Sequence, residues 1–315
     1  MKIVFMGTPE TSLPALEALL AARHEILCVV TQPDRPRGRG QKITPTPVKE
    51  LALKHGLAIE QPEKVRGNQV FISQLKSLAP DIIVVVAYGK ILPKEILDIP
   101  RYGCVNVHAS LLPKYRGAAP VQWALLNGEK ETGVTVMRLD ELLDTGDIIL
   151  QEKISISEDD NTPGLTKKIF ERGSPLLTRA LELIAADQAK YLGQDDRAAS
   201  QAPAIAKESG EIDWRRSADE VHNRVRAMVP WPCAHTFRRE KLLKIWRSER
   251  HVLDLAGKPR LPGTIVQIVK KTGFIVATGQ GHLLIREVQP EGKKRMPAYD
   301  YVIGHDVEIG ETLPN

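Results

Sequence analysis

Residues 81–87, with the sequence DIIVVVA, decide the fold that the chain predicts. The run is apolar and almost continuously β-branched, which is typical of a central parallel strand covered on both faces. Shorter apolar runs at residues 3–6, 25–31 and 103–107 have the same character. Segments with helical spacing of apolar residues separate them, so the first half predicts a parallel sheet with helices on both faces, a Rossmann-like α/β fold.

The other expected elements of this half follow the same reasoning. Residues 7–9, Gly-Thr-Pro, lack the spaced glycines of a dinucleotide motif, and we expect a tight strand-to-helix turn there. Further strands are expected at residues 133–139 and 148–150. Helices are expected at residues 13–22, 47–55, 70–78, 120–127 and 164–185.

The last third of the chain has a different pattern. Residues 186–205 are polar and have no strong period, which indicates a linker. An amphipathic helix is expected at residues 218–228. Short runs broken by Gly and Pro then predict a small all-β barrel or sandwich, with strands at residues 235–237, 242–247, 263–269, 273–278, 282–288 and 307–309.

Length and composition fit an ordinary two-domain globular protein. The chain has 315 residues, of which 42% are hydrophobic and 26% are charged. No apolar run reaches the roughly 18 residues of a membrane helix, and the start predicts a strand rather than a signal peptide. Three widely spaced cysteines predict a reducing compartment, the cytoplasm, and no metal cluster.

Charge is unevenly distributed. Residues 1–200 carry 25 basic and 25 acidic side chains, whereas residues 201–315 carry 19 basic and 14 acidic ones, so the net charge of +5 lies in the last third. Such an excess favours a polyanionic partner, although a solvated surface explains it about equally well.

The residues with the strongest chemical signal are Asn106, His108 and Asp144. Asn106 and His108 are two apart on an expected strand end, so both side chains leave the same face. Asp144 lies in a separate loop, LDTGD at residues 143–147. Either of the first two alone is more often structural, and Asp144 alone fits an ordinary turn. Together they can polarise a carbonyl, stabilise an oxyanion and move a proton, as formyl or acyl transfer between nitrogens requires.

Two further segments bear on binding. Residues 34–49 are rich in Gly, Pro and Arg and carry one acid, Asp34, which indicates either a mobile surface loop or an arm that grips phosphates. Residues 110–113, SLLP, offer backbone amides and apolar side chains to a flat heterocycle. No Ser or Cys lies in a recognisable nucleophile–base arrangement, so we expect direct attack without an acyl-enzyme; Cys104 is the nearest thiol.

These residues together resemble the methionyl-tRNA formyltransferase family, over essentially the whole chain. The motifs are FMGTP at residues 5–9, TQPDRP at 31–36 with GRG at 38–40, VVVAYGKILP at 84–93, NVHASLLP at 106–113, RGAAP at 116–120, VPWP at 229–232 and KIW at 244–246. The central block alone indicates the wider folate-dependent group, and the Arg-rich loop and C-terminal motifs narrow it. Leu142 departs from the family, which usually has Gly there.

The resemblance implies a catalytic domain at residues 1–185, a linker at 186–207 and an OB-like tRNA-binding domain at 208–315. The implied reaction moves a formyl group from 10-formyltetrahydrofolate to the methionine amine of initiator Met-tRNA, with no metal, and with Asn106, His108 and Asp144 as catalytic residues. Membrane and protein partners are not expected, and we expect a monomer. The folate site is expected to comprise Tyr88, Gly89, Leu92, Ser110, Leu111, Leu112, Pro113 and Asp140.

For tRNA, the resemblance places the decisive arginine of the loop at Arg39. The basic C-terminal third is expected to hold the more distal backbone. The expected tRNA-binding set is Arg35, Arg37, Arg39, Lys42, Arg238, Lys293 and Lys294.

Two alternatives remain open. A folate-dependent formyltransferase that acts on a small amine, such as a ribonucleotide or an amino sugar, would share Asn106, His108 and Asp144 without needing a basic C-terminal domain. A non-catalytic RNA-binding protein with a relict enzyme domain would not need the intact trio.

Overall fold

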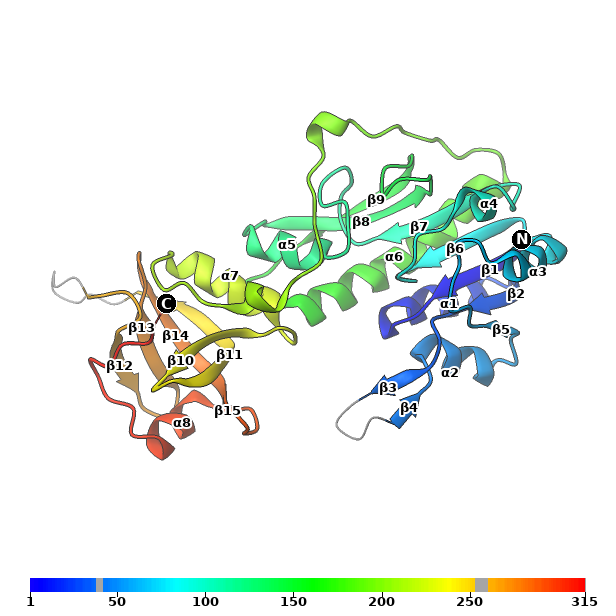
Figure 1. The fold of residues 1–315 in the computed structure, drawn as a ribbon. Helices are drawn as coiled ribbons and strands as arrows, with labels where there is room; N and C mark the ends of the chain where they lie inside the picture. The colour runs from blue at the N-terminus through cyan, green and yellow to red at the C-terminus, as the bar shows by residue number, and fades with distance from the viewer. Residues whose placement is uncertain (38–41, 253–259, 315) are drawn as a thin grey trace. The chain divides into compact units, whose positions relative to one another are not determined.

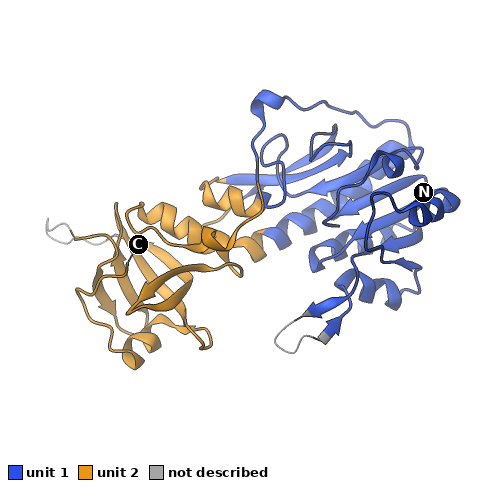
Figure 2. Ribbon diagram, viewed as in Figure 1, with its two compact units in different colours: residues 1–120, 131–155, 166–202 blue, residues 121–130, 156–165, 203–315 orange. Residues whose placement is uncertain are grey.

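The computed structural model describes residues 1–37, 42–252 and 260–314. The chain forms two compact units (Figure 2). Residues 1–120, 131–155 and 166–202 form the α/β unit, and residues 121–130, 156–165 and 203–315 form the C-terminal unit. Among the described residues, no helix is long and apolar enough to cross a membrane.

The α/β unit is built on a seven-stranded sheet of order β5-β2-β1-β6-β7-β8-β9 (Figure 1). The central strand β6 is fully buried, as its apolar sequence predicts. The strands are β1 (Lys2–Gly7), β2 (Glu25–Val30), β5 (Ile59–Glu60), β6 (Ile82–Val86), β7 (Cys104–His108), β8 (Glu131–Arg138) and β9 (Ile148–Ser155).

Helices cover both faces of this sheet. On one face, Phe71 and Leu75 of α3 pack in one buried cluster with Val85 and Cys104 of the sheet. On the other face, Gly173 of α6 lies so close to the sheet that a Cβ there would meet Val107 at 3.0 Å. The helices of this unit are α1 (Leu13–Ala21), α2 (Pro47–Lys54), α3 (Gln69–Leu78), α4 (Lys94–Leu97) and most of α6 (Thr162–Ala185). Helix α5 (Pro120–Leu126) belongs, apart from Pro120, to the C-terminal unit.

The sheet is mixed rather than wholly parallel, which corrects one expectation. β1, β2, β5, β6 and β7 are parallel, but β8 runs antiparallel to β7, and β9 antiparallel to β8. The chain between β8 and β9, residues 139–147, contains no helix that could cross over the sheet, so β9 returns antiparallel beside β8. β9 also extends to Ser155, five residues beyond the expected end.

The Arg-rich segment is not wholly irregular. Within it, β3 (Arg35–Arg37) and β4 (Lys42–Thr44) pair antiparallel as a short hairpin. An ion pair closes its base, because Lys49 Nζ lies 2.6 Å from Asp34 Oδ2. This hydrogen bond to Lys49 is the main reason that the pKa of Asp34 is lowered.

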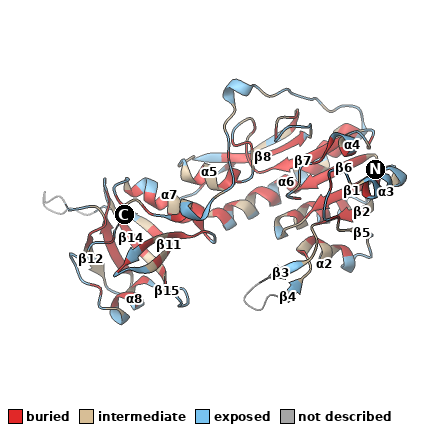
Figure 3. Ribbon diagram, in the orientation of Figure 1, coloured by how far each residue is buried: buried red, intermediate tan, exposed pale blue. Residues whose placement is uncertain are grey.

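The C-terminal unit contains an antiparallel sheet of order β10-β11-β14-β13-β12, with β15 paired to β14. The separate all-β domain that the sequence predicts is therefore present (Figure 3 shows its buried strands). Its elements are α7 (Ala218–Met228), β10 (Ala234–Arg238), β11 (Lys241–His251), β12 (Ile265–Val269), β13 (Gly273–Ala277), β14 (His282–Pro290), β15 (Met296–Pro297) and α8 (Ala298–Gly304).

Two details at the C-terminus differ from expectation. The expected strand at residues 307–309 does not form; this segment is irregular and leads into a turn. Helix α8 precedes it, and its Tyr301 and Val302 are buried. The unit is anchored by Trp214, which is fully buried and donates its indole N–H to Thr236 Oγ1 at 3.3 Å.

Candidate functional site

Asn106 and His108 lie at the carboxyl end of β7, between β6 and β8. Asn106 pairs with Val85 of β6 and Met137 of β8, and His108 pairs with Thr135 of β8. Strand alternation puts both side chains on the face opposite Val107. Helix α6 covers Val107, so Asn106 and His108 leave the sheet on the other side. Among the described residues, none hydrogen-bonds the Asn106 carboxamide, so its donors are available to a ligand.

His108 is buried, and a hydrogen bond at Nε2 fixes its ring. Its Nε2 lies 2.9 Å from the Tyr115 carbonyl oxygen, and its Nδ1 lies 3.6 Å from Asp144 Oδ2. A carbonyl can only accept, so Nε2 carries a proton. The neutral ring therefore presents the Nδ1 lone pair on the Asp144 side, and a second proton there would face a carboxylate.

Asp144 reaches His108 from the loop between β8 and β9. Its backbone has a φ of 56°, the left-handed region that a non-glycine residue adopts only when its surroundings hold it. The carboxylate is buried, and its Oδ2 accepts the Gly117 N–H at 2.9 Å. The structure therefore brings together the three residues that the sequence singles out.

A cleft of about 510 Å³ opens beside this loop. Leu97, Gly103, Leu139 and Asp140 line it, so one of the expected folate residues is in its wall. The Asp140 carboxylate accepts hydrogen bonds from Leu142 N at 3.0 Å and Thr145 Oγ1 at 2.8 Å, which fold the loop. Leu142 lines the cleft but has an exposed fraction of 69%, so the side chain that replaces the usual Gly does not fill it.

The expected folate segment 110–113 is fixed by internal hydrogen bonds. Ser110 Oγ donates to the Lys114 carbonyl at 2.6 Å, and Thr135 Oγ1 donates to the Ser110 carbonyl at 2.6 Å. Leu112 N donates to Thr135 Oγ1 at 3.2 Å, while Leu111 and Pro113 remain half-buried. The segment is thus a rigid wall rather than a set of free donors.

Tyr88, Gly89 and Leu92 follow β6 instead of β7. Tyr88 and Gly89 line a second cleft, of about 620 Å³, with Thr8, Gln32 and Arg35. Leu92 is buried in the apolar cluster against which Leu139 packs. Burial raises the pKa of Tyr88 to about 12, and its hydroxyl is buried without a described hydrogen-bond partner.

Comparison with known proteins decides the family. Residues 1–181 match the family described as formyl transferase, and residues 204–306 match the formyl transferase C-terminal domain. The chain is 48% identical to the methionyl-tRNA formyltransferase of Caldanaerobacter subterraneus, over 99% of this chain and 100% of that one. It is 47% identical to the methionyl-tRNA formyltransferase of Acetivibrio thermocellus, over 99% of both chains.

The chain belongs to the methionyl-tRNA formyltransferase family.

Solved structures share the fold of this formyltransferase at low identity. An N-formyltransferase from Helicobacter canadensis, in complex with folinic acid and dTDP-3-aminofucose, has a TM-score of 0.69 and 19% identity, over 92% of this chain and 99% of that one. HypX from Aquifex aeolicus, in complex with tetrahydrofolic acid, has a TM-score of 0.66 and 16% identity, over 100% of this chain and 51% of that one. At these identities the likeness concerns the fold.

The hairpin formed by β3 and β4 contains part of the expected tRNA-binding set. Arg35 is exposed, and no described residue forms a hydrogen bond or ion pair with its guanidinium. Arg37 and Lys42 pair across the hairpin backbone. Arg39 lies between the two strands, outside the described residues.

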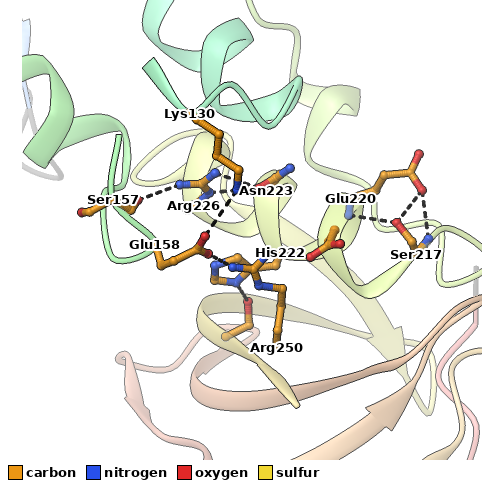
Figure 4. Close-up of polar contacts among 11 residues, drawn as sticks. Lys130, Ser157, Glu158, Ser217, Glu220, His222, Asn223, Arg226 and Arg250 are labelled. Atoms are coloured by element: carbon orange, nitrogen blue, oxygen red, sulfur yellow. Dashed lines mark hydrogen bonds and ion pairs between the residues drawn. The ribbon is translucent and has the colours of Figure 1, made fainter. Parts of the chain in front are cut away.

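In the C-terminal unit, most arginines are already paired with acids. Figure 4 shows Arg250 bonded to Glu158, and Arg250 also pairs with Asp219. Arg295 pairs with Glu287 and stacks over Trp246 at 4.7 Å from the ring centroid. Because these guanidinium charges are compensated, the basic excess of this unit is carried mainly by lysines.

Lys293 and Lys294 are among these lysines. Both are exposed, and neither forms an ion pair with a described residue. They lie in the turn after β14, and the pairing of Leu243 with Pro290 brings Lys241, at the start of β11, to the same end of the sheet. We call Lys241, Lys293 and Lys294 the lysine cluster.

Arg238 does not belong to that surface. Its side chain is only 5% exposed, and it donates to Glu311 at 2.9 Å and to the His305 carbonyl at 2.9 Å. These contacts tie β10 to the C-terminal segment and leave no free face for a phosphate. Arg238 was expected to contact tRNA because charge alone does not reveal burial.

Sequence reasoning also missed the residues behind Asp144. Gln194 donates to the Asp144 and Gly146 carbonyls, and Arg116 donates to Gln194. Gln194 lies in the polar segment expected to be a linker, 50 residues from Asp144 in the chain. No periodicity or motif could have joined them.

Proposed function

We propose that this enzyme transfers the formyl group of 10-formyltetrahydrofolate to the α-amino group of methionine on initiator Met-tRNA. The observation that carries the proposal is the buried His108–Asp144 pair beside the unpartnered Asn106 carboxamide, in a chain 48% identical to a methionyl-tRNA formyltransferase. The amine attacks the formyl carbon directly, and no acyl-enzyme forms.

Asn106 is the proposed oxyanion donor. Its carboxamide N–H groups are available, and its position on a packed strand fixes them without cost at the moment of reaction. Negative charge develops on the formyl oxygen as the amine adds, and a preorganised donor stabilises that charge more than it stabilises the ground state. His108 adds a second donor when Nδ1 is protonated.

His108 and Asp144 are the proposed proton pathway. With Nε2 held by the Tyr115 carbonyl, the Nδ1 lone pair of the neutral ring can accept the proton that the attacking amine must lose. Asp144 Oδ2, 3.6 Å away, then faces the cationic ring and holds its orientation. The same Nδ1–H can return its proton to the leaving nitrogen.

The folate donor, when bound, supplies the formyl carbon next to this trio. The cleft can hold a flat heterocycle, because it sets the apolar side chains of Leu97, Leu139 and Leu142 beside polar and charged groups and the loop at residues 138–142. Leu112 of the segment at residues 110–113 belongs to a buried cluster against which Leu139 of this cleft packs. The expected folate residues Tyr88 and Gly89 face the second cleft and contribute less directly.

The proposed tRNA contacts are the hairpin and the lysine cluster. In the sequence, Arg35, Arg37, Arg39 and Lys42 fall within eight residues, and we take Arg39 as the decisive one among them. A guanidinium can pair bidentately with a phosphate and stack on an unpaired base. The lysine cluster attracts the more distal backbone, so binding should weaken as salt rises.

The cellular setting proposed for the enzyme is the cytoplasm, where Met-tRNA is used. The three cysteines are free and buried, which suits a reducing compartment. The proposed working form is a monomer without a membrane or protein partner.

A direct assay tests the function. Purified enzyme is incubated with 10-formyltetrahydrofolate and, separately, with initiator Met-tRNA, free methionine and an amino sugar nucleotide, and the formylated products are quantified. We expect formyl-Met-tRNA at a rate at least about 100-fold above either small amine, because the tRNA contacts supply most of the binding. Faster formylation of the sugar amine would assign the chain to the small-amine alternative.

A further inference from the structure

Residues 192–202 of the α/β unit, which we call the strap, bond to the start of β9 and to the loop that follows β7. At one end, Leu192 and Ile148 exchange two backbone hydrogen bonds of 2.9 Å. At the other end, Arg116 N donates to the Ser200 carbonyl at 2.8 Å, and Ala202 N donates to the Arg116 carbonyl at 2.7 Å. The strap therefore bonds to both loops that meet at Asp144.

Gln194 lies at the centre of this arrangement. Its Nε2 donates to the Asp144 carbonyl at 3.0 Å and to the Gly146 carbonyl at 2.7 Å. Its Oε1 accepts from Arg116 Nε at 3.0 Å and Nη2 at 2.9 Å. Arginine only donates and carbonyls only accept, so the orientation of the amide is forced.

Arg116 holds Gln194 and the strap together. Its side chain is 6% exposed, and its Nη2 also lies 2.8 Å from Asp196 Oδ1 of the strap. A buried guanidinium with these partners cannot easily move, and it fixes Gln194 in turn. Thus Arg116 orients Gln194, and Gln194 holds the backbone of Asp144.

The opposite end of Asp144 is held through the same strap. The Asp144 carboxylate accepts from Gly117 N, and Gly117, at a φ of 128°, lies so close to the strap that a Cβ would meet the Ala202 carbonyl at 2.6 Å. Both the carbonyl and the carboxylate of Asp144 are therefore set by loops that the strap joins. This explains how a non-glycine residue keeps a φ of 56° beside His108.

We propose that Gln194 is a positioning residue for formyl transfer, which holds Asp144 at His108 through its hydrogen bonds to the Asp144 and Gly146 carbonyls. The segment that the sequence marks as a linker is thus part of the catalytic scaffold. The inference rests on the proposed function of the trio. It predicts a larger change in the chemical step than in substrate binding, because the Gln194 side chain holds the Asp144 backbone and does not itself line the cleft, although Gly146, whose carbonyl it also holds, does.

The test variant is Gln194→Glu, and its matched control is Gln188→Glu. Glutamate keeps both acceptor bonds from Arg116 but points an oxygen at two carbonyl oxygens. Gln188 is exposed, lies six residues upstream and undergoes the same chemical change. We expect kcat to fall about 10- to 100-fold in Gln194→Glu, since small misplacements of catalytic groups have effects of this size. KM for Met-tRNA should stay within about twofold, KM for 10-formyltetrahydrofolate should change by less than kcat does, and Gln188→Glu should match the wild type.

The same substitution in an Asp144→Ala enzyme distinguishes a positioning role from general support of the fold. If Gln194 acts through Asp144, Gln194→Glu should cause little further loss of kcat in an Asp144→Ala enzyme. The inference would be overturned if Gln194→Glu lowered kcat by the same factor in the wild-type and Asp144→Ala enzymes, or if kcat of the single variant were normal. Should Gln194→Glu fail to fold by circular dichroism, Gln194→Met removes the same two donated bonds without adding charge. It also removes the acceptor for Arg116, and the same loss of kcat is expected. A wild-type enzyme that forms no formyl-Met-tRNA would instead refute the proposed function, and this inference with it.

Discussion

His108 in the α/β unit and His222 in the C-terminal unit are about equally buried, with exposed fractions of 6% and 8%. Their neighbours differ in kind. His108 faces two acceptors, the Tyr115 carbonyl and the Asp144 carboxylate, so its ring can gain a second proton without losing a contact. His222 bonds through Nδ1 to Ser248 Oγ at 3.0 Å and lies near the Arg226 guanidinium.

Because their neighbours differ, the two histidines have different roles, proton transfer for His108 and a structural contact for His222. Burial, with a smaller effect of Arg226, lowers the pKa of His222 to about 4, despite opposing effects of Asp219, Asp159 and Glu249. His222 is therefore kept neutral and joins α7 to β11 (Figure 4). A buried histidine becomes a candidate for proton transfer through its partners and not through its burial.

The largest expected effect tests the catalytic side of this comparison. Asn106→Ala and His108→Ala should each lower kcat by about 100- to 1000-fold, because each removes a group that acts on charge developing in the reaction. Folate binding, measured by fluorescence titration, should change by less than about threefold. Near-normal kcat in both variants would reject the assignment of the site.

The next effect concerns the tRNA side of the α/β unit. Arg39→Ala should lower kcat/KM for Met-tRNA by about 10- to 100-fold, the range that one charge-assisted contact supplies. Folate affinity of the free enzyme should stay near normal. As a control, Lys76→Ala removes an exposed cation from α3 and should have little effect. Parallel loss of tRNA activity and folate binding would mean that the segment supports the folate site instead.

The other histidine should influence stability rather than rate. Since the folded pKa of His222 lies below its ordinary 6.5, the unfolded chain takes up a proton first as the pH falls. The stability that the neutral ring provides is present above about pH 6.5 and is lost toward pH 4, by about 2 kcal/mol between pH 7 and 5. His222→Gln should remove most of this slope while leaving kcat near normal at pH 7.

Urea unfolding of the full chain can follow this change by tryptophan fluorescence. All four tryptophans, Trp123, Trp214, Trp231 and Trp246, belong to the C-terminal unit, so the signal reports that unit. An unchanged slope in His222→Gln would show that other groups dominate the acid response.

The smallest effect is expected at Cys104. The thiol is buried, its pKa is raised to about 12 by burial, and its Sγ faces the Leu97 carbonyl at 3.9 Å. A thiol held in this state is a poor nucleophile. Cys104→Ala should therefore keep kcat within about twofold and lower the stability by about 1 kcal/mol. Abolished turnover with an intact fold would argue for an acyl-enzyme.

Local sequence signals were enough to predict most of the α/β unit. The run at residues 81–87 became the fully buried β6, and the spacing of Asn106 and His108 placed them on one face of β7. Both predictions depend on neighbours in sequence, where the period of the side chains is decisive. The direction of β8 and β9 was not predicted, because short apolar strands look alike in either direction.

Contacts between distant residues account for the remaining differences. Gln194 and Arg238 owe their roles to partners 50 and 73 residues away, which no local pattern reveals. The hairpin β3–β4 was hidden by its Gly, Pro and Arg content, which favours loops in general. Helix α8 was missed because its short sequence AYDYVIG carries no clear period.

The central claim is that His108 and Asp144 act as one unit in formyl transfer. Single-turnover rates of formyl-Met-tRNA formation by wild type, His108→Ala, Asp144→Ala and the double variant test it most directly. Residues that act as a unit are strongly non-additive, so the double variant should be about as slow as the slower single variant. Rate losses that multiply in the double variant would show that the two residues act independently, and would contradict the account.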